Sequence, residues 1–224
     1  MRAIVYRRSE AENGSLLLNV ITQNGKTKKL KIPGILKSKT RNGYFLAPAT
    51  IWEFTIAGND RETVTPKEYN LIHSPFDFSA SYEELARLGE LLKPLIFLRP
   101  DLELVSLYQC LTETLYQWNG DDKTNSSILT SQFYLFFLKC MGLLHYSSQC
   151  IHCDCVLQNF DRYHLYSGSI CANCLKKQVY HEDELVPNLW FGHYLGKIND
   201  KPDFEPGQEK FIRQKILSYL KTSL

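Results

Sequence analysis

The chain lacks the sequence patterns by which most catalytic sites are recognised. Its 224 residues contain no glycine-rich phosphate-binding loop, no H-E-x-x-H pair and no nucleophile elbow. The histidines, among them His73, His145 and His164, are scattered without a partner at motif spacing. These absences favour a protein that is not an enzyme, and they leave an enzyme with a structural metal as the weaker alternative.

Long hydrophobic runs are also missing. The first eight residues contain no apolar core for a signal peptide, and every apolar cluster ends before the roughly 18 residues that a spanning helix needs. The seven cysteines are odd in number, and Cys150, Cys153 and Cys155 fall within six residues, which suits a reducing compartment better than a secreted disulfide protein. We therefore expect a soluble, cytoplasmic protein with no membrane partner.

Four cysteines form the most specific motif. Cys150-Ile-His-Cys153 and Cys171-Ala-Asn-Cys174 are separated by seventeen residues. A two-residue gap lets one tight turn of the chain supply two thiolates, and two such knuckles at this spacing predict a tetrahedral Zn²⁺ site. Four thiolates leave no open coordination position, so the predicted zinc stabilises structure and does not catalyse.

The sequence leaves alternatives for this site. Cys155 is a candidate to replace Cys153 as a ligand, and His152 is a candidate competitor for the metal. A lobe with buried thiols and no metal is the simpler alternative. Cys110 and Cys140 lie on helical apolar stripes and are predicted to be small buried hydrophobic residues.

The net charge of +2 hides an uneven distribution of charge along the chain. Residues 1–56 carry ten Lys or Arg against three Asp or Glu, residues 57–149 carry seven against twelve, and residues 150–224 carry nine against nine. The positive charge is therefore concentrated in an amino-terminal module, which favours a polyanionic partner there.

The first 75 residues predict β-strands. Ser15–Gln23 and Lys26–Pro33 flank Asn24-Gly25, which is the strongest short hairpin signal because a tight two-residue turn needs positive φ at both positions. About five strands are expected, the number of a small barrel of the oligonucleotide-binding (OB) type. The other three candidates are Ala3–Arg7, Tyr44–Ile56 and Arg61–Thr65.

Cations follow this hairpin and the loop after it. Neighbouring side chains of a strand point to opposite faces, so Lys28 and Lys29 cannot both point inward. Cations placed in this way are suited to bind a phosphate backbone. The simpler alternative is an edge strand whose lysines are solvated and prevent pairing with other strands. Tyr44, Phe45 and Trp52 are candidates either for base stacking or for the core. The predicted nucleic-acid-binding cations here are Lys26, Lys28, Lys29, Lys31, Lys37, Lys39 and Arg41.

From residue 79 the pattern becomes helical. Ser81 with Glu84 forms a capping box, after which leucines recur at helical spacing. Ile128–Met141 is apolar on most sides and is predicted to lie at the centre of the helical core, after a polar loop at Asp121–Ser127. The expected domains are residues 1–78 for the barrel, 79–147 with 177–224 for the helices, and 148–176 for the zinc lobe. Further helices are predicted at Leu104–Trp118 and at about Gly207–Leu220.

The order of these parts resembles RecO, a family of bacterial recombination mediators. Leu16–Gly25 is similar to the family's second strand, Lys31–Lys39 to its glycine-centred basic segment, and Leu46-Ala-Pro-Ala to its Leu-x-Pro strand. Gln132–Gly142 is similar to the helix before the zinc lobe, with glutamine where the family has a basic residue. The resemblance spans nearly the whole chain and implies an α+β multidomain fold, in which an OB-fold barrel precedes a helical domain with an inserted four-cysteine zinc lobe.

The resemblance implies a non-enzymatic mediator. Such a protein binds single- and double-stranded DNA, anneals complementary strands and, with RecR, helps to load RecA onto strands coated by single-stranded DNA-binding protein. It also adds Arg7 and Arg8 to the expected DNA-binding residues, RecF to the expected partners, and the nucleoid as the expected location. Two other classes stay open, a zinc-ribbon adaptor that binds another protein and an RNA-binding protein that uses the same barrel.

Overall fold

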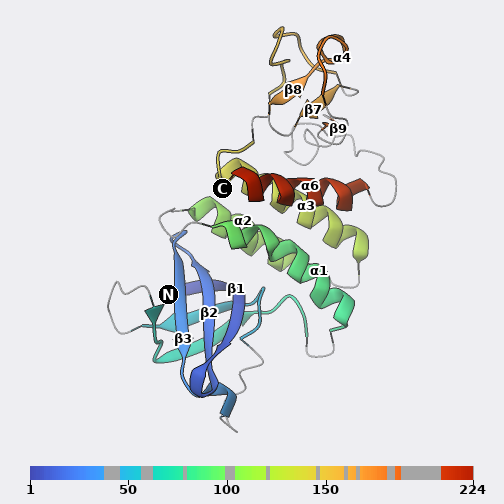
Figure 1. Cartoon of the computed structure of the whole chain (residues 1–224). Coiled ribbons are helices and arrows are strands. Elements are labelled where there is room, and N and C mark those ends of the chain that lie inside the picture. The colour runs from blue at the N-terminus through green and yellow to red at the C-terminus, as the bar shows by residue number, and fades with distance from the viewer. Residues whose placement is uncertain are drawn as a thin grey trace. The chain divides into compact units, whose positions relative to one another are not determined.

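The chain forms two compact units, Met1–Leu129 and Thr130–Leu224, in a computed structural model. Figure 1 shows the strands of the first unit in blue to cyan and the small sheet of the second in orange. The structure describes residues 1–37, 46–56, 63–77, 80–98, 104–119, 122–144, 147–158, 161–164, 167–180, 185–187 and 208–223.

A curled six-stranded sheet dominates the first unit and forms a half-barrel (Figure 1). It is mixed, because β3 and β5 run parallel while the other neighbours are antiparallel. Together with the helices described below, this sheet agrees with the predicted α+β class. In the sheet order β5-β3-β2-β1-β4-β6, the strands are β1 (Arg2–Ala11), β2 (Ser15–Thr22), β3 (Thr27–Ile32), β4 (Ile51–Thr55), β5 (Thr63–Val64) and β6 (Glu68–His73).

The prediction of about five strands is wrong by one edge strand. β6 pairs with β4 at the edge of the sheet, and its side chains are exposed or half-buried along its whole length. A strand without a buried face has no alternation of apolar and polar residues, so the sequence carried no period-two signal there. The predicted strand Tyr44–Ile56 is also too long, since β4 covers Ile51–Thr55 and residues 44 and 45 lie outside the described part.

The hairpin between β2 and β3 lies where Asn24-Gly25 predicts it, but its turn is of another type. Of the two residues only Gly25 has a positive φ, 75°. The Gly25 N–H donates to the Thr22 carbonyl over 2.8 Å, and the Thr22 N–H donates to the Lys26 carbonyl over 2.9 Å. This pattern is a type I turn closed by a glycine bulge, which also suits the twist of the two strands.

The inner face of the sheet carries the core of the first unit. Trp52 is only 5% exposed, and its indole N–H donates to Thr50 Oγ1 over 2.7 Å. It therefore belongs to the core and is excluded as a platform for stacked bases, whereas Tyr44 and Phe45 lie outside the described residues. The core cluster consists of Ala3, Val5, Leu16, Leu18, Val20, Leu30, Ile32, Ile35, Leu46, Trp52, Phe54 and Val64.

Helices follow the sheet. α1 (Tyr82–Leu92) begins as predicted, with Ser81 Oγ accepting the Glu84 N–H over 3.2 Å. A 3-10 turn (Lys93–Phe97) and α2 (Val105–Gln117) come next. α3 (Lys123–Cys140) starts before the predicted Ile128, because Asp122 Oδ1 accepts the Asn125 N–H over 2.9 Å and caps the residues that were expected to form a polar loop.

The hairpin tip lies against the start of α2. The Leu104 N–H donates to the Gly25 carbonyl over 3.1 Å, and a Cβ on Gly25 would lie 2.3 Å from the Val105 nitrogen. On the outer face nearby, Ile4 and Ile21 pair across β1 and β2 and are fully buried. The helical segment therefore covers one end of that face, while Lys29 and Lys31 at the other end are exposed.

The second unit combines helical packing with a small sheet. Tyr134 and Leu135 of α3 are fully buried, and Arg213 of α6 (Gln208–Ser223) donates to Ser131 Oγ over 2.8 Å. The small sheet has the strand order β8-β7-β9, and α4 follows β8 along the chain. Its elements are β7 (Arg162–His164), β8 (Gly168–Ile170), α4 (Ala172–Leu175) and β9 (Leu185–Pro187). Within the described part of the chain, no helix combines the length and the apolar composition needed to cross a bilayer.

Candidate metal centre and basic groove

The first cysteine knuckle is held by its own backbone. The Cys150 N–H donates to the Cys155 carbonyl and the Asp154 N–H donates to the Cys150 carbonyl, both over 2.9 Å. Asp154 adopts a positive φ of 57°, a conformation that Asp tolerates better than most residues. The chain therefore reverses within a few residues and brings the thiols of Cys150 and Cys153 to one side.

The second knuckle is the start of a helix. Cys171 caps α4, and its Sγ accepts the Cys174 N–H over 3.4 Å. Asp161, which is only 3% exposed, joins this knuckle to the end of the first loop, since its carboxylate accepts the Gln158 N–H over 2.6 Å and the Ala172 N–H over 2.8 Å. These two hydrogen bonds satisfy the buried carboxylate and tie the two knuckles together.

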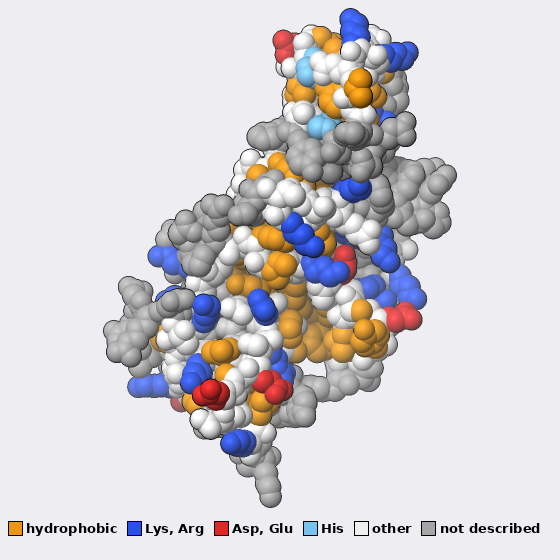
Figure 2. Space-filling model, in the orientation of Figure 1, with side chains coloured by type: hydrophobic (Ala, Val, Ile, Leu, Met, Phe, Trp, Pro, Cys, Tyr) orange, Lys and Arg blue, Asp and Glu red, His pale blue; other side chains and the backbone are white. Residues whose placement is uncertain are grey.

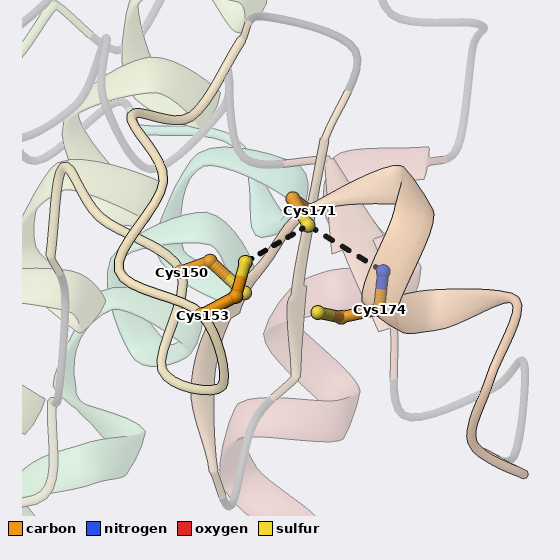
Figure 3. A group of neighbouring side chains, drawn as sticks. All are labelled: Cys150, Cys153, Cys171 and Cys174. Atoms are coloured by element: carbon orange, nitrogen blue, oxygen red, sulfur yellow. Dashed lines mark hydrogen bonds between the residues drawn. The ribbon is translucent and has the colours of Figure 1, made fainter.

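The four thiols converge on one point (Figure 3). The sulfurs of Cys150, Cys153, Cys171 and Cys174 all lie within 4.8 Å of one another, and Cys153 Sγ is 3.7 Å from Cys171 Sγ. Ligands of a tetrahedral zinc with Zn–S bonds of about 2.3 Å are separated by about 3.8 Å. All seven cysteines are free thiols. The four predicted ligands are therefore placed to hold a metal ion, and their number and chemistry fit a closed structural site.

The two alternative ligands are positioned differently. His152 Nε2 is hydrogen-bonded to the Tyr180 hydroxyl over 2.6 Å. Hydrogen bonds with the Cys153 thiol raise the pKa of Cys155 to about 12, and they do the same to Cys174, so the pKa does not separate these two thiols. The sulfur positions do, because Cys155 is not among the four cysteines whose sulfurs lie within 4.8 Å of one another. The Cys174 N–H lowers the pKa of the Cys171 thiol to about 6, which favours a thiolate at the centre of the cluster. This arrangement favours Cys153 over Cys155 and His152.

A second candidate site is a row of polar side chains across three strands of the first unit. Arg7 is paired with Asn19, and Asn19 with Lys29, so the three lie side by side on the outer face of β1, β2 and β3. Lys31 follows Lys29 on the same face, because alternate residues of a strand share a face. A bulge in β1 inserts Tyr6 before Arg7 and shifts the register there.

A groove of about 210 Å³ lies beside this row. Ile96, which is 58% exposed, and the half-buried Leu98 come from the segment after α1 and form its apolar side. No ion pair joins Arg7 or Lys31 to a carboxylate among the residues that the structure describes. The other residues that line the groove come from β1, β2 and β3, and they are Tyr6, Arg7, Asn19, Thr27, Lys28 and Lys29.

The other predicted cations are more dispersed. Lys28 is half-buried opposite Val20 and faces the inner side of the sheet, as alternation with Lys29 requires. Arg8 is half-buried, while Lys26 and Lys37 are exposed near the two ends of β3. Lys39 and Arg41 lie outside the described residues. Figure 2 shows blue Lys and Arg side chains spread over the strand-rich part of the chain with few red acidic ones among them.

A larger hollow of about 520 Å³ in the first unit has a different character. Its lining contains no Lys or Arg among the described residues, and Thr50, Ser74 and Asp77 are its main polar members. Such a surface does not suit a phosphate backbone, which requires cations. The apolar lining includes Pro48, Leu71, Phe76, Leu85, Leu88 and Leu92.

Some residues of the groove were not among the residues predicted to bind nucleic acid. Asn19 carried a usable signal, because it is a polar residue within an otherwise apolar strand. Tyr6 and Ile96 carried none, since an aromatic residue in a strand and an isoleucine after a helix are ordinarily core residues. The tertiary structure alone brings these residues together with Arg7 and Lys29.

Comparison with known proteins assigns no family to the chain. A scan against protein-family models and a search of curated proteins each returned no match. The function of the chain is therefore inferred from the geometry of the cysteine cluster and the basic groove, together with the order of parts along the sequence.

Proposed function

We propose that this chain is a non-enzymatic nucleic-acid-binding protein that acts as a recombination mediator of the RecO type. The observation that carries the proposal is the row of Arg7, Asn19 and Lys29, with Lys31 beside it, on an exposed part of the half-barrel. In the proposed protein this surface binds the sugar-phosphate backbone, and the sheet is the half-barrel of an OB-fold domain.

The spacing of the cations supports this role. Lys29 and Lys31 are two residues apart on one strand, a rise of about 7 Å, and Arg7 lies two strands away from Lys29, at about 10 Å. Long flexible side chains on such a grid reach successive phosphates without reading base edges. Binding is therefore expected to tolerate any sequence and to weaken steeply with salt, because bound cations release counterions from the polymer.

The mediator role follows from the same electrostatics and from the resemblance to RecO. Cations that shield two strands at once reduce the repulsion between their phosphates and let complementary strands pair. With RecR, and with RecF as a further partner, the protein would help to load RecA onto strands coated by single-stranded DNA-binding protein. Gln132 is exposed on α3, so binding of that protein's acidic tail would use other residues than the family's basic one.

The metal has a structural role in this proposal. Cys150, Cys153, Cys171 and Cys174 would hold one Zn²⁺, which supplies folding free energy to the small lobe around β7, β8 and α4. Among the described residues, the buried cluster at the two knuckles consists of Cys150, Ile170 and Cys171, two of which are predicted ligands, and Tyr163 of β7 is also buried. A lobe with so small a core depends on metal for its stability.

Nucleic-acid binding across a salt series tests the proposal. Fluorescence anisotropy of a labelled oligonucleotide between 50 and 200 mM salt should give a log–log slope of about −2 to −3 if Arg7, Lys29 and Lys31 each contact one phosphate. Purified protein should also accelerate the annealing of two complementary oligonucleotides. Absence of binding at low salt would contradict the proposal, and competition between matched DNA and RNA strands separates a DNA-binding from an RNA-binding protein.

A protein-interaction adaptor is the second candidate, and the large apolar hollow favours it. Leu71 and Leu85 line the hollow and are both 44% exposed, as expected for a site that receives an apolar side chain of a partner protein. Substitution of Leu85 by Asp should then abolish capture of a protein partner while leaving nucleic-acid affinity unchanged. A protein that binds partners but shows no salt-dependent binding of nucleic acid would be an adaptor.

A further inference from the structure

We infer that the groove beside Arg7 receives an unpaired base, so that the preferred substrate of this surface is single-stranded nucleic acid. The inference rests on the proposed nucleic-acid binding and adds to it a strand preference and a base-contacting residue, Tyr6. Neither charge nor strand count in the sequence indicates this preference.

The two sides of the groove differ in chemistry. Arg7 and Lys29 provide positive charge on one side, whereas Ile96 and Leu98 provide an apolar surface on the other. An apolar side is of no use to a phosphate, and an isoleucine that is 58% exposed loses solvent contact when a flat ring covers it. A nucleotide offers both kinds of surface, since its phosphate is anionic and the faces of its base are apolar.

Tyr6 is the aromatic residue among those that line this groove. It is the extra residue of the β1 bulge, a device that turns a side chain away from the regular alternation of the strand. Tyr6 is half-buried, and this burial raises the pKa of its hydroxyl above 10 despite the neighbouring Arg7. In the inferred complex the ring of Tyr6 is the surface on which the base stacks.

A duplex does not use this groove. Its bases are stacked on their neighbours and their faces are inaccessible, so only its phosphates reach Lys29 and Lys31. A single strand can place phosphates on the cations and turn one base onto Tyr6 and Ile96. Loss of a stacking aromatic should lower single-strand affinity about 5- to 140-fold and leave duplex affinity unchanged.

The test measures anisotropy of a labelled twelve-nucleotide oligothymidylate and of a labelled twelve-base-pair duplex. The wild type should bind the single strand more tightly. Tyr6→Leu should reduce single-strand affinity only, and Tyr6→Phe, which keeps the ring, should behave as the wild type. Tyr82→Leu is the matched control, because Tyr82 is an 86% exposed tyrosine on α1 that lies outside the groove.

If Tyr6→Leu fails to fold, photo-crosslinking of the wild type tests whether Tyr6 contacts the base. An oligothymidylate with one 5-iododeoxyuridine should crosslink to Tyr6 of the wild type, as mapped by mass spectrometry. Equal losses of single-strand and duplex affinity in Tyr6→Leu, or crosslinking elsewhere only, would overturn the inference and leave nucleic-acid binding standing. A wild type that binds neither polymer would overturn the proposed function itself.

Discussion

Removal of two cations from the outer face of β3 should weaken nucleic-acid binding by a calculable amount. In the variant Lys29→Ala/Lys31→Ala, both lost side chains are exposed and lie on one face of the strand. Each phosphate contact on a single strand contributes about 0.7 to the log–log salt slope, and on duplex DNA about 0.9. The slope should therefore become less steep by about 1.4 to 1.8.

The same numbers give the loss of affinity. At 0.1 M salt, relative to 1 M, each contact contributes about 0.7 to 0.9 logarithmic units of binding, so two lost contacts should reduce affinity about 25- to 60-fold. Exposed substitutions of this kind change the free energy of unfolding by less than about 0.5 kcal/mol each. The melting temperature should therefore stay close to that of the wild type.

The assay is anisotropy of a labelled oligonucleotide from 50 to 200 mM salt, with Lys210→Ala/Lys221→Ala as the control. That control removes the same charge from two exposed positions of α6 in the second unit. Affinity in the control should fall much less than in Lys29→Ala/Lys31→Ala. Equal losses in the two variants would mean that net charge, and not the surface of β3, controls binding, and an unchanged slope would remove these lysines from the mechanism.

Three further outcomes are expected from the metal centre and the hairpin. Metal analysis should find about one zinc per chain, and Cys171→Ser should lose it. Cys155→Ser should keep its zinc, whereas Cys153→Ser should lose it. The reverse result would mean that Cys155, and not Cys153, is the fourth ligand. Gly25→Ala should lower the free energy of unfolding in urea by more than about 2 kcal/mol, because the clash of its Cβ with the backbone at the start of α2 adds to the cost of a φ of 75°. Gly34→Ala, which shares a positive φ but has open space around it, should cost only about 1–2 kcal/mol. Similar losses in both glycine variants would show that the close approach at the hairpin tip does not matter.

Features that depend on neighbouring residues were predictable from the sequence. The cap at Ser81 and the position of the hairpin depend on a few consecutive residues, and the structure places both where they were expected. Predictions that needed distant contacts were less successful. The exposed edge strand β6 has no buried face to mark it and is recognised only by its pairing with β4. The early start of α3 is a different case, because the cap by Asp122 is local but lies in a segment whose polar composition predicted a loop.

The two candidate sites also differ in how far the sequence alone could predict them. The pairs Cys150 with Cys153 and Cys171 with Cys174 are local in the chain, and because zinc accepts thiolates only in a narrow geometry, their spacing alone predicted the cluster that the fold assembles. The groove was not predictable, because strand register places Arg7 beside Lys29 and the segment after α1 brings Ile96 against them. Charge along a chain is set by its residues, but the surface on which charge and apolar side chains meet is set by packing between segments far apart in sequence.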